Sequence, residues 1–77
     1  MEELTFGQKA VSWNPKGYAN PEVGEMKAKF AAIIDELDKK RSETEDGNVK
    51  RLCATAINNA ETASMWAVKS LTWTEEK

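Results

Sequence analysis

The chain has 77 residues, a length that fits one domain with a small hydrophobic core. It has one cysteine, Cys53, and no histidine, so an intrachain disulfide is excluded and a zinc site is not expected. The net charge of −2 argues against charge-driven binding along DNA, while leaving room for a small anionic ligand.

Residues 1–19 are predicted to form an irregular arm, because their apolar residues follow no sustained period. A short helical turn fits before Trp13. The run from Asn14 to Gly17 has the residue types of a turn, with proline early and glycine at its end.

A first helix is predicted over residues 20–41. Asn20 can cap free backbone amides, and Pro21 suits the first helical position, where a missing N–H costs nothing. Spacings of three and four residues then give one apolar stripe. The stripe consists of Val23, Met26, Phe30, Ile33, Ile34 and Leu37.

A polar connection follows at residues 42–47, and it ends in the turn signal Asp46-Gly47. Because this connection is short, the simplest geometry is an antiparallel pair of helices. The chain is therefore expected to be an all-α hairpin.

The second helix is predicted over residues 48–72, with Asn48 as its cap, and residues 73–77 form a tail in which Trp73 can dock. Small residues recur along the helix and would let another helix approach closely; they are Ala56, Ala60, Ala63 and Ala67. Apolar character extends beyond them to Met65 and Trp66. This apolar surface is wider than a single partner helix can cover. A domain this small usually needs a disulfide, a bound metal or oligomerisation for additional stability, and the first two are not expected here. We therefore expect a homo-oligomer.

Catalytic residues are sparse. The absence of histidine removes the commonest general base, and Cys53 lies among apolar residues, where a packing role is expected. No catalytic residue, metal or cofactor is predicted, so an enzyme such as a phosphodiesterase is the least favoured class.

No stretch approaches the ~20 apolar residues of a membrane span, and the acidic start lacks the features of a signal peptide. We expect a cytosolic protein.

Binding residues are better represented, in two places. Trp13 and Tyr18 lie in the arm beside Lys16, where flat rings can stack on nucleobases and a lysine can meet a phosphate. Arg51 and Thr55 share a helix face and can offer a guanidinium and a hydroxyl to a phosphate. The simpler interpretations are aromatics that hold the arm on the helices, an exposed arginine, and a threonine bonded to its own backbone.

The residues resemble the sequence pattern of a known phage hairpin domain. In the first half the similar residues are Trp13-Asn14-Pro15, Asn20-Pro21-Glu22-Val23, Lys27 and Ile33-Ile34-Asp35. In the second half they are Arg51-Leu52, Thr55-Ala56-Ile57, Glu61, Ala63 and Met65-Trp66-Ala67-Val68-Lys69. Over about residues 13–73 the chain is thus similar to the second class of anti-CBASS proteins, which share this domain with Thoeris-counteracting sponges.

The resemblance implies a compact homohexamer of helical hairpins in the cytoplasm of an infected bacterium. Such sponges bind cyclic dinucleotides between protomers and cyclic trinucleotides near three-fold axes, without cleaving them, so that phage evades CBASS immunity.

By position, the resemblance assigns the dinucleotide pocket to Trp13 or Tyr18 together with Lys27, with Lys29 as the second choice of lysine. It assigns the trinucleotide pocket to Arg51 and Thr55. The alternative function is a helical oligomeric interaction protein that binds or inhibits a protein partner.

Overall fold

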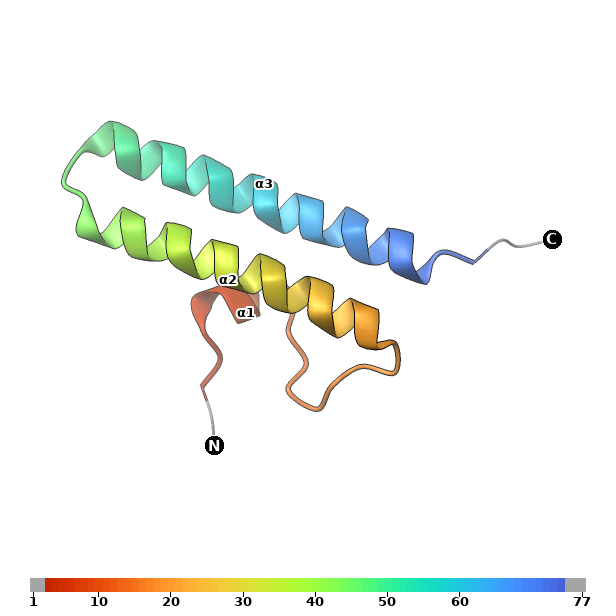
Figure 1. Ribbon diagram of the computed structural model, residues 1–77. Helices are drawn as coiled ribbons and strands as arrows, with labels where there is room; N and C mark the ends of the chain where they lie inside the picture. Colours follow the sequence, from red (N-terminus) through yellow and green to blue (C-terminus); the bar gives the residue numbers. More distant parts are fainter. Residues whose placement is uncertain (1–2, 75–77) are drawn as a thin grey trace.

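Three helices build the computed structural model, which describes residues 3–74: α1 (Phe6–Ala10), α2 (Pro21–Glu43) and α3 (Gly47–Thr72) (Figure 1). α2 and α3 run antiparallel and pack along their length, and α1 lies against α2. The expected all-helical hairpin is confirmed. Residues 75–77 of the predicted tail lie outside the described residues.

α2 begins where the sequence predicts. The Asn20 side chain accepts a hydrogen bond from the Glu22 amide at 2.9 Å, and Pro21 takes the first helical position. The helix continues to Glu43, two residues beyond the predicted end, and the Lys50 ammonium donates to the Arg41 carbonyl at 3.0 Å. That bond satisfies one of the carbonyls left without a partner at the end of α2.

The predicted cap of the second helix is wrong by two residues. Asp46, not Asn48, caps α3, and its carboxylate accepts a hydrogen bond from the Asn48 amide at 2.8 Å. A carboxylate at this position also suits the positive end of the helix dipole. The helix therefore begins at Gly47, and the connection between the helices is only residues 44–46.

The core is small and lies where α1, α2 and α3 meet. Its buried members are Val11, Ala31, Ile34 and Ile57, with Ala10, Trp13, Phe30, Leu37 and Ala60 packed against them. Ile34 is the only side chain of the described residues that is fully buried, at 0% exposure. Ile33, which the sequence places in the same stripe, is 49% exposed, so the buried stripe of α2 is narrower than predicted.

α3 faces α2 mainly through residues outside the predicted line of alanines, which was expected to let another helix approach. Cys53, Ile57 and Ser64 are buried, whereas Ala63 is exposed. The predicted alanine seam therefore coincides only in part with the α2–α3 interface, chiefly at Ala60. Cys53 is a buried packing residue, as expected.

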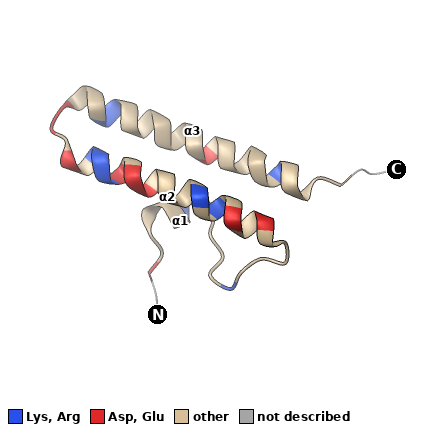
Figure 2. Cartoon of the chain, viewed as in Figure 1, with Lys and Arg blue, Asp and Glu red and all other residues tan. Residues whose placement is uncertain are grey.

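The molecule is one layer of helices. Its extents are 52 × 33 × 12 Å, and the smallest is about the diameter of one helix. α3 carries four charged residues in 26, against eleven in 23 for α2, so charge gathers on α2 (Figure 2). Large apolar side chains are correspondingly exposed along α3: Leu52, Met65, Trp66 and, at its end, Trp73. Within residues 3–74, no helix combines the length and apolar character needed to cross a bilayer.

The half-buried Ala60 gives a test of the core. Ala60→Leu should lower the free energy of unfolding by about 1–3 kcal/mol, since extra methylenes in a packed core force neighbours apart. Denaturant unfolding measures this. The matched control is Ala32→Leu, on the exposed face of α2, and equal stabilities of the two variants would contradict the placement of Ala60 in the core.

Candidate functional site

Three residues singled out in the sequence come together at the arm. The rings of Trp13 and Tyr18 pack edge to face, with centroids 5.7 Å apart. The Lys27 ammonium lies 5.0 Å from the centroid of the Tyr18 ring, a cation–π distance. All three side chains are half-buried. The arm and the start of α2 therefore form one cluster of two aromatics and a cation, here called the arm cluster.

The Ser12 carbonyl lies at the centre of the arm cluster. The Tyr18 hydroxyl donates to it at 3.1 Å, and the Lys27 ammonium donates to it at 3.2 Å. The Asn14 amide in turn donates to the Tyr18 hydroxyl at 2.7 Å. Ser12 has a φ of 58°, a left-handed conformation that few residues other than glycine adopt. The hydrogen bonds to the Ser12 carbonyl offset the free-energy cost of that conformation and hold the carbonyl toward Lys27.

A turn brings Tyr18 back to the cluster. The Gly17 amide donates to the Asn14 carbonyl, and the Lys16 amide donates to the Asn14 side chain, both at 3.0 Å. Gly17 has a φ of 95°, which a residue with a side chain adopts only with strain. Tyr18 then lies over Gly24, where a Cβ would be 3.3 Å from the tyrosine ring.

A hollow of about 290 Å³ adjoins Lys27, between the arm, α2 and α3. Its lining consists of Ala10, Val11, Ser12, Lys27, Ser64, Met65 and Val68. Most of these residues were not candidates in the sequence, because α3 reaches the arm only through the packing of the hairpin. Lys27 thus contacts the Tyr18 ring and also lines a partly apolar hollow.

The arm cluster can hold an anion beside a flat ring. Lys27 has three N–H donors and gives one to Ser12, so the others can meet a phosphate. Trp13 and Tyr18 present ring surface for stacking on a base. The second-choice lysine, Lys29, is exposed on α2.

Arg51 and Thr55 lie elsewhere, near the end of the hairpin that holds the turn, whereas Lys27 lies near its open end. Both are exposed, and the Thr55 hydroxyl donates to the Arg51 carbonyl at 3.0 Å. The threonine therefore bonds to its own helix, as the simpler interpretation expects. Within residues 3–74 the only ion pair joins Arg41 to Asp38, so the Arg51 guanidinium faces solvent.

The Met-Trp-Ala-Val-Lys segment presents its largest side chain outward. Trp66 is 63% exposed, and the Lys69 ammonium lies 5.4 Å from its ring centroid and 5.9 Å from that of Trp73. Among residues 3–74, no three histidine, cysteine or carboxylate side chains gather as a metal site would require.

Comparison with protein families places this hairpin. The family model described as the Acb2/Tad1, hairpin domain, matches residues 19–72, more than half of the chain. The matched range contains Lys27, Arg51 and Thr55, whereas Trp13 and Tyr18 precede it. Comparison with curated proteins and with solved structures gave no significant match.

The Tyr18 hydroxyl allows a test of the arm cluster. Tyr18→Phe keeps the ring but removes one donor and one acceptor, so amide exchange at Asn14 should accelerate and the free energy of unfolding fall by about 1 kcal/mol. Hydrogen exchange followed by NMR measures the first effect, with α3 amides as the internal control. Unchanged protection of the Asn14 amide would contradict the network around Ser12.

Proposed function

The chain belongs to the Acb2/Tad1 hairpin domain family, the anti-CBASS and anti-Thoeris sponges, and we propose that it sequesters cyclic di- and trinucleotides without cleaving them. In this way phage would evade CBASS immunity in the cytoplasm of its bacterial host. The observation that carries the proposal is the contact of two aromatic rings with the Lys27 ammonium, which also lines the neighbouring hollow.

For cyclic dinucleotides, the proposed site is the arm cluster. A base stacks on Tyr18 or Trp13, a contact worth ~1–3 kcal/mol per base. Lys27 turns from the Ser12 carbonyl toward a phosphate, exchanging a neutral acceptor for a charged one. The hollow beside Lys27 receives the rest of the ligand or a residue of a neighbouring copy.

For cyclic trinucleotides, the proposed site is Arg51 with Thr55. One copy offers a single guanidinium, whereas a cyclic trinucleotide carries three phosphates around a ring. Several copies meeting at a symmetry axis would bring their Arg51 side chains together, and these cations would repel one another unless an anion lay between them. The Thr55 hydroxyl can leave its backbone partner at small cost, because the phosphate is the stronger acceptor.

The trinucleotide site therefore depends on assembly, and the proposed assembly is a homohexamer. The support is physical: a single layer 12 Å thick leaves Leu52, Met65 and Trp66 exposed along a helix with few charges. Apolar surface of this kind marks an interface, and a large aromatic such as Trp66 is a typical anchor.

Sequestration requires no catalytic chemistry. The sequence has no histidine, and binding alone lowers the concentration of free signal when the binder is in excess and affinity is high.

The exposed apolar surface of α3 also suits a second function, the binding of a protein partner. That alternative gives no role to Lys27 beside the aromatic rings.

Lys27 tests the dinucleotide site. Lys27→Ala should weaken binding of cyclic GMP–AMP by about 10- to 100-fold, the loss expected for a hydrogen bond to a charged group. Isothermal titration measures it. Lys39→Ala, an exposed lysine of α2, is the matched control, and equal affinities of the two variants would exclude the arm cluster as the site.

Arg51 tests the trinucleotide site and separates a sponge from a protein-binding module. Arg51→Ala should abolish binding of cyclic tri-adenylate without changing the mass of the oligomer, because the side chain faces solvent. Titration and light scattering measure the two quantities. Wild-type complexes should release intact ligand on denaturation, and recovery of a linear product would contradict sequestration.

A further inference from the structure

The arm follows one line of residues on α2. Lys27, Ala31 and Asp35 are four residues apart and so share a face of the helix. The Ser12 carbonyl accepts from Lys27, and Gly7 lies against Ala31 and Asp35. The arm therefore runs antiparallel to α2. Its contacts at Ser12 and Gly7 are with α2 residues about 12 Å apart along the helix axis.

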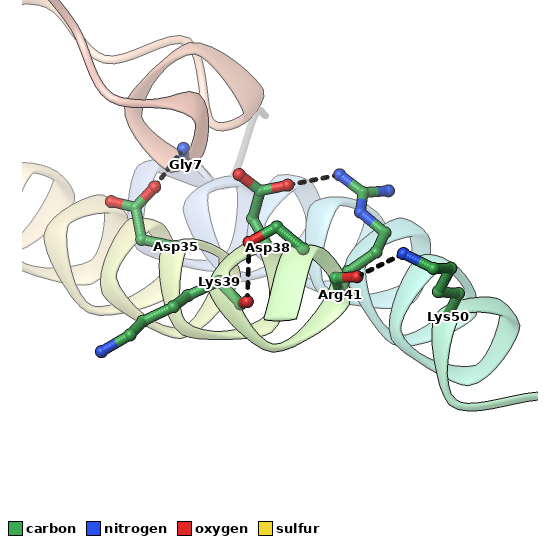
Figure 3. Close-up of polar contacts among 7 residues, drawn as sticks. Gly7, Asp35, Asp38, Lys39, Arg41 and Lys50 are labelled. Carbon is green, nitrogen blue, oxygen red and sulfur yellow. Dashed lines mark hydrogen bonds and ion pairs between the residues drawn. The ribbon is translucent and has the colours of Figure 1, made fainter. Parts of the chain in front are cut away.

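The contact at Gly7 is unusually close. A Cβ at this residue would lie 2.1 Å from the Ala31 carbonyl oxygen, so no side chain fits. The Gly7 amide donates to a carboxylate oxygen of Asp35 at 2.7 Å, and both groups face each other between the helices (Figure 3). Gly7 is buried, so this charged acceptor satisfies an amide that water cannot reach.

The other contacts of the arm do not fix its register as this one does. Val11 is buried in the core, but apolar contact is non-directional. The Phe6 ring lies 5.5 Å from the Arg41 guanidinium, and the Phe6 side chain is 44% exposed to solvent. The bond between Gly7 and Asp35 is thus the directional contact at this end of the arm.

A segment with its own backbone hydrogen bonds connects this bond to the arm cluster. The Val11 amide donates to the Gly7 carbonyl at 3.1 Å, and the Trp13 amide donates to the Gln8 carbonyl at 2.8 Å. A displacement of Gly7 along α2 would consequently move Ser12 and Trp13 by a similar amount relative to Lys27.

We propose that Asp35 is a positioning residue for the ligand site at Lys27. It does not touch the ligand. By holding the Gly7 amide it sets where Ser12 and Trp13 lie relative to the Lys27 ammonium, and so whether base stacking and phosphate binding occur together. This inference rests on the proposed binding of cyclic dinucleotides at the arm cluster.

The test compares Asp35→Ala with Asp35→Asn, which retains an acceptor oxygen. In Asp35→Ala, exchange of the Val11 and Trp13 amides should rise about tenfold and affinity for cyclic GMP–AMP should fall about tenfold, the effect of one hydrogen bond to a charged acceptor. Asp35→Asn should recover most of both. Oligomer mass and affinity for cyclic tri-adenylate should not change, since Asp35 bonds to Gly7 of α1 whereas Arg51 is exposed on α3.

A second pair of variants perturbs the same contact from the arm. Gly7→Ala should reproduce the effects of Asp35→Ala, because its Cβ cannot fit against Ala31. Gly47→Ala is the matched control, since nothing lies within 4 Å of a Cβ built there.

The outcomes separate the inference from the function on which it rests. No binding of cyclic GMP–AMP by the wild type would overturn the proposed function, whatever the exchange rates. Tight binding by the wild type and equally tight binding by Asp35→Ala, with the arm loosened, would overturn the positioning role alone. Loss of cyclic tri-adenylate binding in Asp35→Ala would show general damage and overturn it too.

Discussion

Two helices side by side make a layer only about one helix diameter thick, and a layer has no interior. Apart from side chains that the arm covers, such as Ala31, those of α2 and α3 outside their shared line lie on open faces. This explains why, among residues 3–74, Ile34 alone is fully buried while Trp66 is mostly exposed. It also explains why residues that would form the core of a larger domain here remain as surface. The stability of such a chain depends on what covers those faces.

The arm covers part of this surface and does so with little bulk. Glycine at residue 7 lets backbone meet backbone, and Val11 then reaches the core beside Ile34 and Ile57. The same placement brings the Ser12 carbonyl to Lys27. One set of contacts therefore closes the core and assembles the arm cluster, so the candidate site is a consequence of how a thin hairpin protects its apolar residues.

The two candidate sites differ in what a single copy supplies. The arm cluster is largely formed within one chain, with its hydrogen bonds already in place around Ser12. Arg51 and Thr55 instead lie on an exposed helix face, and the threonine hydroxyl bonds to its own backbone. A site built from such residues gains its geometry from neighbouring copies, whereas the arm cluster gains much of its geometry from the fold.

Local patterns in the sequence were sufficient for the helices, since caps and apolar periodicity act over a few residues: Asn20 and Pro21 begin α2 as predicted, and Cys53 is buried. They were not sufficient where two nearby residues can both cap a helix, and Asp46 rather than Asn48 caps α3. The candidate residues Trp13, Tyr18 and Lys27 were identifiable as types, but not as a cluster. Only the tertiary structure joined Gly7 to Asp35, 28 residues away, and brought Ser64 and Met65 to the hollow at Lys27. Contacts between distant residues depend on how the helices pack, which periodicity does not encode.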